Sequence, residues 1–557
     1  MKYNKICRAI AILTTATVLG QLTVACNSSQ SGGSAPQQEM AQIARQQPAS
    51  APVARTSAKP ASAPANKMAE PALVQGSPLD QQSSGEAYDR IEENPFQRAS
   101  KNPLSTFSID VDAASYSNVR RFINQGQLPP KDAVRIEELI NYFNYEYPQP
   151  ESDRPFSVST EISQTPWNPN HRLVHIGLQG KQISTENLPP SNLVFLIDAS
   201  GSMDDPNKLP LLKSAFRLLV NELRDNDKVS IVVYAGAAGV VLPPTPGNQK
   251  DKILDAIEKL QAGGSTAGGE GIQLAYKLAQ DHFIKSGNNR VILATDGDFN
   301  VGVSSDSELV SLIEQKRGEG VFLTVLGVGI GNLQDAKMEK LADKGNGNYA
   351  YIDNILEAKK VLVKEMGGTL LTIAKDVKIQ VEFNPAKVQG YRLIGYENRM
   401  LQTEDFQDDK KDAGELGAGH AVTALYEIIP VGVKSNVKLS DGDDSNTQKA
   451  EKQAIFGNQE LMQVRLRYKA PNQTTSQLLT SSVVDRGLKL EEASTNYKFS
   501  AAVATFGMVL RDSQYKGKAS FDDVLKLANQ SQGEDLDGYR AEFIRLVERS
   551  KSLTARE

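Results

Sequence analysis

Cysteine and histidine are scarce in this sequence of 557 residues. Both cysteines, Cys7 and Cys26, lie near the start of the chain. The remaining residues therefore offer no thiol for a disulfide, a thiolate nucleophile or a zinc site. The histidines show neither metal-ligand nor catalytic-triad spacing; they are His171, His175, His282 and His420. These absences weigh against the commonest kinds of nucleophilic and zinc-dependent catalysis.

An excess of charge of one sign is also lacking. Lysine and arginine number 62 against 67 aspartates and glutamates, a net charge of −5. A nucleic-acid-binding protein needs a concentrated basic surface, so we expect no nucleic acid as partner. Gly263–Gly269 lacks the lysine of a phosphate-binding loop, and Ser200 does not lie in a G-x-S-x-G turn. We therefore predict that the protein is not an enzyme and has no catalytic residues.

The first 25 residues predict a lipoprotein signal peptide. Three basic residues precede an apolar run over Ala9–Ala25, the order typical of a secretory leader. Thr23–Cys26 resembles a bacterial lipobox, which implies that Cys26 becomes the lipidated first residue. A transmembrane anchor is the alternative, although the run is shorter than the roughly 20 residues that span a bilayer. Asn27 follows the cysteine, and by analogy with lipoprotein sorting this favours the outer membrane of the cell envelope.

Residues 26–100 are predicted to form a disordered, lipid-anchored tether. Ser, Ala, Gln and Pro dominate, and the sequence PASAP occurs twice. Such a segment cannot bury enough apolar surface to fold. A flexible chain of this length spans roughly 50 Å. We expect it to hold the folded part of the protein away from the membrane.

The central feature of the chain is Leu193–Met203, LVFLIDASGSM. A continuous apolar run ends on Asp198, and Ser200 and Ser202 follow at two-residue steps. A second apolar run, VILATDG, ends on Asp296. Uninterrupted apolar runs are typical of strands buried on both faces of a parallel sheet. Because ligands bind at the carboxyl ends of such strands, we expect these polar side chains to lie together.

These residues resemble the metal-ion-dependent adhesion site of von Willebrand factor A domains, Asp-x-Ser-x-Ser…Thr…Asp. A loop just before an apolar helix supplies the threonine, Thr266. Carboxylates and hydroxyls are hard ligands that suit Mg²⁺, or alternatively Mn²⁺ or Ca²⁺, rather than zinc. In such a site an Asp or Glu of a protein partner completes the coordination. The resemblance implies five metal ligands: Asp198, Ser200, Ser202, Thr266 and Asp296.

Residues 190–368 are predicted to form this A domain, a doubly wound α/β fold with a mostly parallel, Rossmann-like sheet. Helical patterns and buried strands alternate there. Alternating runs on either side, such as Phe156–Ile162 and Val377–Phe383, indicate antiparallel sheets with one wet face. We expect the A domain to be inserted in, or flanked by, a β-sandwich-like domain. Residues 101–189 form its first part, and residues 369–557 add strands and then C-terminal helices.

The sequence also resembles the YfbK-type family of bacterial A-domain lipoproteins. The likeness extends from about residue 101 to the C-terminus and is carried by segments such as LSTFSIDVDAASYSNVRRFIN, LATDGDFNVGV and RLIGYENR. It implies the same three-part layout and supplies neither a ligand nor a reaction.

Two functions are compatible with these patterns. The first is a membrane-tethered envelope lipoprotein that binds a protein partner through a metal-bridged acidic side chain. The alternative is a structural scaffold in which the metal only orders the loops. We interpret Asp110 and Asp112 as a solvated strand face and a helix cap, and Asp204 with Asp205 as a solvated acidic turn. A second cation site is the alternative for each pair.

Overall fold

The computed structural model describes residues 85–151, 153–184, 188–264, 268–297, 305–365, 371–441 and 456–555. All of them belong to one compact unit, Leu79–Glu557. The predicted signal peptide, Cys26 and residues 26–84 of the predicted tether lie outside the described residues. Within the described ranges, no helix combines the length and hydrophobicity that a membrane span requires.

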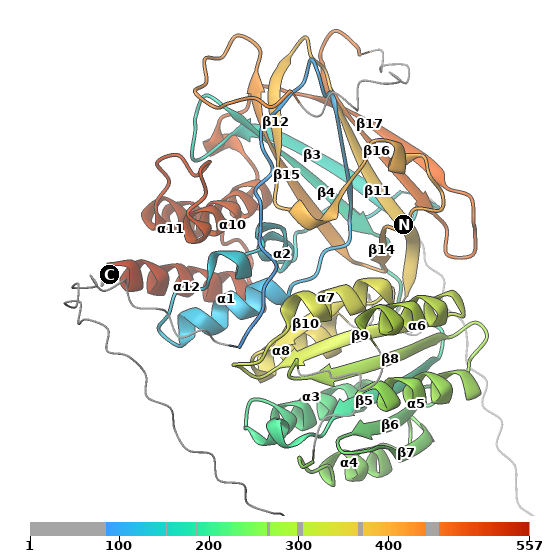
Figure 1. The fold of residues 1–557 in the computed structure, drawn as a ribbon. Helices are drawn as coiled ribbons and strands as arrows, with labels where there is room; N and C mark the ends of the chain where they lie inside the picture. Colours follow the sequence, from blue (N-terminus) through green and yellow to red (C-terminus); the bar gives the residue numbers. More distant parts are fainter. Residues whose placement is uncertain are drawn as a thin grey trace, which may run out of the picture. The chain divides into compact units, whose positions relative to one another are not determined.

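Six strands form the central sheet of the A domain, in the order β10-β9-β8-β5-β6-β7 (Figure 1). The pairs from β10 to β6 are parallel, and β7 pairs with β6 in the antiparallel sense. Every residue of β5 is buried, as expected for the middle of a sheet covered on both faces. The strands are β5 Ser191–Asp198, β6 Lys228–Tyr234, β7 Ala238–Pro246, β8 Asn288–Thr295, β9 Val321–Val328 and β10 Tyr349–Ile352.

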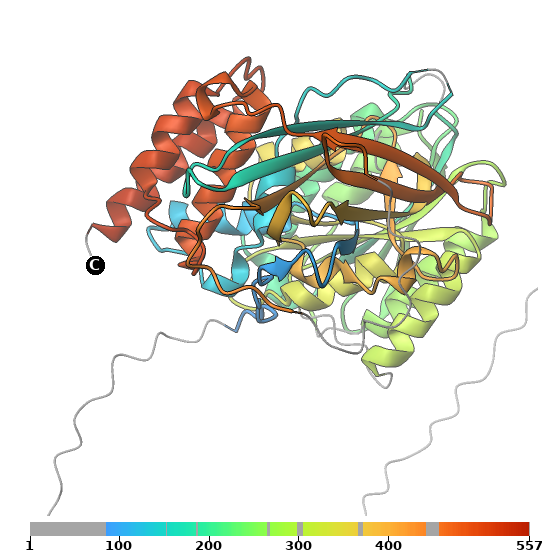
Figure 2. The ribbon, with the colours of Figure 1, turned by 90° about the horizontal axis from the view of Figure 1, so that it is seen from above.

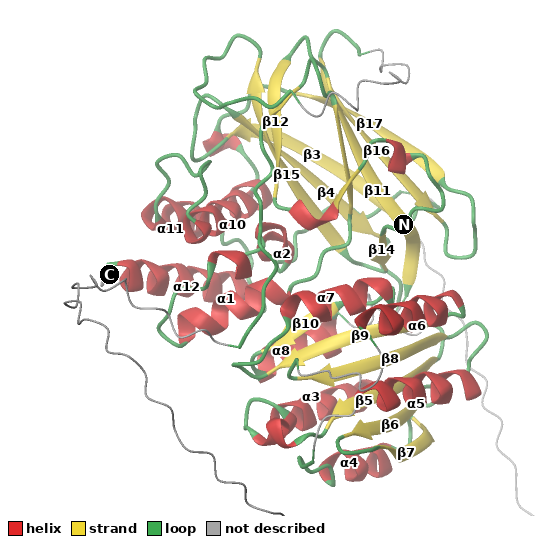
Figure 3. Cartoon of the chain, in the orientation of Figure 1, coloured by secondary structure: helices red, strands yellow, loops and turns green. Residues whose placement is uncertain are grey.

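Helices cover both faces of this sheet, as Figure 3 shows in red. Apolar side chains of α3, α4 and α8 pack in one core, and those of α5, α6 and α7 pack in another. This arrangement confirms the predicted doubly wound fold. The helices are α3 Leu209–Glu222, α4 Lys250–Glu258, α5 Gly268–Asp281, α6 Asp306–Gly318, α7 Asp335–Lys344 and α8 Ile355–Lys359, with a π-helical turn over Lys360–Lys364.

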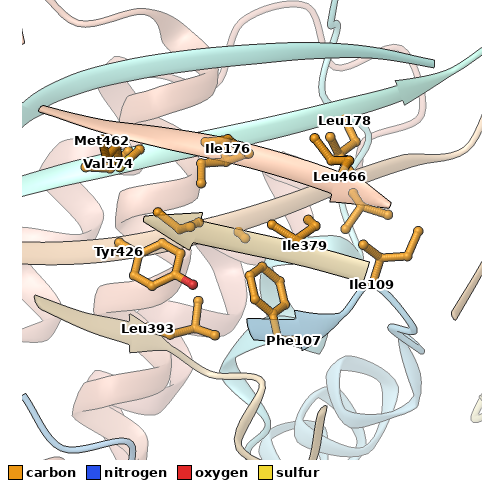
Figure 4. Packing of buried hydrophobic residues seen from close by; sticks show 14 of the residues in the cluster. Phe107, Ile109, Val174, Ile176, Leu178, Ile379, Leu393, Tyr426, Met462 and Leu466 are labelled. Atoms are coloured by element: carbon orange, nitrogen blue, oxygen red, sulfur yellow. The ribbon is translucent and has the colours of Figure 1, made fainter. Parts of the chain in front are cut away.

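Two antiparallel sheets form a sandwich outside the A domain. Their orders are β1-β12-β15-β4-β3 and β13-β2-β11-β16-β17, with β14 paired to β11. Side chains from both sheets fill one core between them (Figure 4). The strands are β1 Gln97–Arg98, β2 Leu104–Ser108, β3 Phe156–Gln164, β4 Arg172–Gly180, β11 Thr372–Phe383, β12 Val388–Ile394, β13 Met400–Leu401, β14 Gly414–Gly417, β15 Ala421–Pro430, β16 Glu460–Lys469 and β17 Gln477–Val484.

The A domain is an insertion into this sandwich. Strands β1 to β4 precede it in the chain, and β11 to β17 follow it. β4 lies between β3 and β15, and β2 lies between β11 and β13. Each sheet therefore needs strands from both sides of the insertion before it can form.

A cluster of helices packs on the outer face of the β4–β15 sheet. Leu173 of β4, Leu425 of β15 and Ile394 of β12 join its apolar core. Figure 2 shows the last three helices, in red, gathered at one side of the strands. The helices are α1 Ala114–Asn124, α2 Ile136–Asn141, α10 Thr495–Arg511, α11 Phe521–Gln530 and α12 Tyr539–Thr554.

Residues 85–100 belong to the folded unit, not to the tether that the sequence predicts up to residue 100. Phe96 and Ala99 are completely buried, and β1 pairs with β12. The carboxylate of Glu86 accepts hydrogen bonds from Arg121 at 2.9 and 2.8 Å and from the Gly331 backbone at 2.9 Å. On average this stretch has a polar composition, so composition alone does not reveal the few residues, such as Phe96 and Glu86, that attach it to the fold.

Buried ion pairs join the A domain to the flanking region. Arg120 of α1 donates to Asp353 at 2.8 Å and to Glu357 at 2.7 Å. Arg135, just before α2, pairs with Asp335 of α7. Arg399, in the turn after β12, pairs with Glu339 and Asp343 of α7. We call this set the ionic interface: Arg120, Arg135 and Arg399 with Asp335, Glu339, Asp343, Asp353 and Glu357.

Asp110 and Asp112 border this interface. Asp112 is buried, and its Oδ1 accepts a hydrogen bond of 2.8 Å from the Tyr349 backbone. Arg399 lies 3.4 Å from Asp110 and 3.6 Å from Asp112. The N-cap of α1 is Ala113, without a side-chain cap. The interpretation of this pair as a solvated face and a helix cap is therefore wrong, because an arginine more than 280 positions away in the chain recruits both carboxylates.

Candidate metal centre

Four of the five predicted ligands lie at one edge of the A-domain sheet. Asp198 ends β5, and Asp296 follows the last residue of β8, the parallel strand beside it. After β5, Ser200 lies directly before a 3-10 helical turn over Gly201–Asp204, and Ser202 lies within that turn. Both carboxylates are completely buried, whereas Ser202 is exposed. We call Asp198, Ser200, Ser202 and Asp296 the metal edge.

The carboxylate of Asp198 is fixed by three neighbours. Its Oδ1 accepts a hydrogen bond from the Ser200 backbone at 2.9 Å. Its Oδ2 accepts from the Tyr234 hydroxyl and the Thr295 hydroxyl, both at 3.2 Å. Burial raises the pKa of Asp198, and the charge of Asp296 adds to this while the hydrogen bonds oppose it. The Asp198 carboxylate is thus held in one orientation, while its negative charge is only partly compensated.

Asp296 has a different environment. Its Oδ2 accepts a hydrogen bond of 2.9 Å from the ammonium of Lys208. Asn332 and Ser202 also donate to its carboxylate. Burial raises the pKa of Asp296, but the hydrogen bonds from these three side chains outweigh it and lower the pKa below its usual value. This carboxylate is therefore held in the charged form that a cation binds.

Backbone contacts hold the loops of the metal edge. The two serine hydroxyls lie 3.0 Å apart, so Ser200 and Ser202 converge. Gly201 donates to the Gly264 carbonyl at 3.0 Å, and Gly263 donates to the Ala199 carbonyl at 2.8 Å. The loop that leads to Thr266 is thereby joined to the loop after β5. Thr266 itself lies outside the described residues.

Gly297 sets the path of the chain after Asp296. Its φ of +112° lies in a region that side chains disfavour. A Cβ at this position would meet the Asn332 carbonyl oxygen at 2.5 Å. The absence of a side chain therefore lets the loop after β9 approach closely enough for Asn332 to reach Asp296.

The donor set fits a hard divalent cation. It consists of two carboxylates and two hydroxyls, all oxygens, on adjacent elements. No described part of the chain holds a group of three or more His, Cys, Asp or Glu that could bind a metal ion by itself. A cation at this edge would consequently rely on hydroxyls and water as well as carboxylates. It would keep a positive charge and a position for an external anionic ligand.

Asp204 and Asp205 do not join this set. Both are exposed, in the turn that precedes α3. Asp205 lies 4.0 Å from the ammonium of Lys208, and its side chain is 67% exposed. The structure thus places this pair in a solvated acidic turn.

The sequence motif does not include three further residues that lie at this edge: Tyr234, Thr295 and Lys208. Tyr234 pairs with Asp198 in the register of β5 and β6, so its position at the end of a buried strand is the signal that could have identified it. Thr295 ends β8 immediately before Asp296. Lys208 gives no such signal, because a lysine just before a helix is ordinarily a surface residue.

Comparisons with known proteins identify the A domain. Residues 192–363 match the family described as von Willebrand factor type A domain, and residues 82–175 match one described as von Willebrand factor. A domain of this class implies a protein-interaction or adhesion-type function. A solved structure, von Willebrand factor type A from Catenulispora acidiphila, is 18% identical with a TM-score of 0.39 and covers 71% of this chain and 91% of its own.

Matches that extend beyond the A domain identify the family to which the chain belongs. Residues 368–553 match the family described as "Uncharacterized protein YfbK, C-terminal". YfbK of Escherichia coli K12 is 45% identical over 475 residues, 84% of this chain and 81% of that protein. Inter-alpha-trypsin inhibitor heavy chain H3 of Bos taurus is 26% identical over 166 residues, 28% of this chain and 18% of its own. The chain belongs to the YfbK family of A-domain proteins, as its sequence predicts.

Proposed function

We propose that the A domain binds a protein partner through a divalent cation held at the metal edge. Asp198, Ser200, Ser202 and Asp296 would hold the cation, together with Thr266 on the strength of the sequence motif. The cation, Mg²⁺ before Mn²⁺ or Ca²⁺, would supply a Lewis-acidic position for an Asp or Glu side chain of the partner. The protein then acts by adhesion and not as an enzyme.

The single observation that carries this proposal is the placement of the two aspartates. Two carboxylates are buried side by side at the ends of adjacent strands, next to the buried Ser200 and the exposed Ser202. Burying two acidic groups together is costly unless a positive charge compensates them. One lysine supplies a single charge, which leaves the pair one charge short of neutrality. A bound divalent cation supplies the missing charge and one more, which an acidic side chain of the partner can neutralise.

The residues of this chain perform two tasks in such a site. Tyr234, Thr295 and the Ser200 backbone orient the Asp198 carboxylate. The exposed position of Ser202 leaves the edge open to a partner. No described histidine contacts the metal edge, and His175 is buried elsewhere, where burial lowers its pKa to about 4. No histidine is therefore available there as a general base among the described residues.

We further propose that Cys26 carries a lipid and that the protein resides in the cell envelope, on the outer membrane. Support comes from the basic, apolar and lipobox-like order of the first 26 residues. Membrane fractionation of wild type and Cys26→Ser in the native host tests this. The wild type should sediment with outer-membrane vesicles and the variant should not, whereas equal distributions would contradict the anchor.

An in-cell crosslinking pull-down tests the adhesion proposal. Wild type and Asp198→Ala would each be captured with Mg²⁺ and with EDTA. Partners that wild type retains in Mg²⁺, and that disappear in the other three conditions, support metal-bridged capture. A partner list that neither the substitution nor chelation alters would contradict it and favour a scaffold whose flanking domain makes the contacts.

A further inference from the structure

Lys208 is a buried cation at the metal edge that the metal-ligand motif does not include. Its side chain is 6% exposed, and its ammonium lies 2.9 Å from Asp296 Oδ2. The only other acidic partner within reach among the described residues is Asp205, at 4.0 Å, which is largely exposed. Lysine is rarely buried unless a charge partner holds it. The contact with Asp296 is thus the reason that this side chain points inward.

The fold makes room for the lysine from the opposite side. Gly329, directly after β9, has a φ of +79° and faces the lysine stem. A Cβ at Gly329 would meet Lys208 Cε at 2.4 Å and Cγ at 2.8 Å. The channel for the side chain therefore exists because residue 329 carries none. Two separate elements cooperate to bring one positive charge to Asp296.

The charge balance at this edge follows directly. Asp198 and Asp296 contribute two negative charges, and Lys208 contributes one positive charge. The metal-free edge is therefore left with one net negative charge. With a divalent cation bound, the same edge would carry one net positive charge. A lysine at this place thus opposes metal binding and leaves a surplus that an anionic ligand removes.

Resting on the metal site of the proposed function, we propose that Lys208 is the built-in counter-ion of Asp296 and sets a low affinity for the divalent cation. The metal-free edge is then stable without a cation. The cation binds tightly only when an acidic side chain of the partner neutralises the remaining positive charge. Metal and partner consequently bind with positive cooperativity, so capture responds to the acidic ligand rather than to the metal alone.

Mn²⁺ binding by the full-length protein, measured by electron paramagnetic resonance, tests this proposal. Lys208→Gln removes the charge and keeps a hydrogen-bond donor, and Lys208→Met removes both. Lys259→Met, at an exposed position, controls for the change in net charge. We expect both Lys208 variants to bind Mn²⁺ at least tenfold more tightly than wild type, and the control to stay within about twofold. An unchanged or weaker affinity in the Lys208 variants would overturn the proposal.

Thermal unfolding supplies a second readout that does not depend on metal binding by wild type. In EDTA, Lys208→Gln should unfold at a lower temperature than wild type, because Asp296 loses its counter-ion. Added Mg²⁺ should raise the midpoint of the variant by more than that of wild type. An equal midpoint in EDTA contradicts the counter-ion role.

The two proposals fail in distinguishable ways. If neither wild type nor the Lys208 variants bind Mn²⁺, the metal site of the proposed function is wrong, while the midpoint in EDTA still decides the counter-ion role. If wild type binds Mn²⁺ in a manner that Asp198→Ala abolishes, and Lys208→Gln binds no better, the counter-ion proposal alone is wrong.

Discussion

Acidic residues serve opposite purposes at two places in the A domain. At the ionic interface, buried carboxylates receive guanidinium groups from the flanking region, as Arg120 does with Asp353 and Glu357. At the metal edge, buried carboxylates receive hydroxyls, amides and one ammonium. Arginine presents a planar, rigid set of donors that pairs with a carboxylate and neutralises its charge. Hydroxyls orient a carboxylate without neutralising it, so its charge stays available.

The difference shows how the A domain can be firmly attached to the flanking region at one place and ready to bind a ligand at another. The interface holds the A domain against the sandwich into which it is inserted. The metal edge has its polar groups positioned in advance and keeps Ser202 at the surface.

Arg120→Ala should produce the largest effect, because it removes a buried arginine of the ionic interface. The arginine is 2% exposed and contacts Asp353, Glu357 and Glu542. Its loss leaves buried carboxylates without compensation, which costs about 3–5 kcal/mol. Urea denaturation should show this loss of unfolding free energy.

Arg217→Ala is the matched control for that experiment. Arg217 pairs with Glu258 at the surface, and both side chains are about half exposed. An exposed pair contributes about 0–1 kcal/mol. Equal losses in the two variants would show that the interface arginine has no special role.

Glu137→Gln should alter the pH dependence of stability. Burial, with the charges of Glu397 and Glu138, raises the pKa of Glu137 to about 7 from its usual 4.5. Between these values the folded state binds more protons than the unfolded state, so this group makes stability fall as the pH rises from about 4.5 to 7. The variant should show a flatter thermal-midpoint profile over that range than wild type. Glu534→Gln, at an exposed position, is the control, and parallel profiles for Glu137→Gln and wild type would contradict the prediction.

Tyr234→Phe should have the smallest effect, confined to the metal edge. It removes one of the hydrogen bonds that orient Asp198. A bond worth about 1 kcal/mol corresponds to a loss of about fivefold in Mn²⁺ affinity. Tyr276→Phe is the matched control, because no described residue hydrogen-bonds the buried Tyr276 hydroxyl. If both variants keep wild-type affinity, orientation of Asp198 by Tyr234 is unimportant.

Much of the fold could be predicted because its signals are local. The uninterrupted apolar run before Asp198 predicts a strand buried on both faces, and β5 is one. The alternation around Val377–Phe383 predicts an antiparallel strand with one wet face. β11 pairs in that sense with both neighbours, but the wet face is wrong, because Lys378, Gln380 and Glu382 are buried. These patterns depend on residues a few positions apart, so the sequence displays them directly.

The remainder depends on contacts between distant residues. Arg399 contacts Asp343 and Asp112 only through the fold, because these residues are more than 50 and 280 positions away from it in the chain. Lys208 points inward because Gly329, more than 100 positions later, leaves space for it. Residues 85–100 have a polar composition but become ordered through Phe96 and Glu86. Neither composition nor periodicity carries information about such long-range partners.

Mn²⁺ titration of the full-length protein by electron paramagnetic resonance asks whether the metal edge binds a divalent cation through Asp198. Wild type would be compared with Asp198→Asn, which keeps the shape of the side chain, and with Asp204→Asn, in the neighbouring exposed turn. We expect one weakly bound Mn²⁺ in wild type and in Asp204→Asn, and a loss of at least about 100-fold in affinity for Asp198→Asn. Absence of Mn²⁺ binding by wild type, or equal binding by all three proteins, would contradict it.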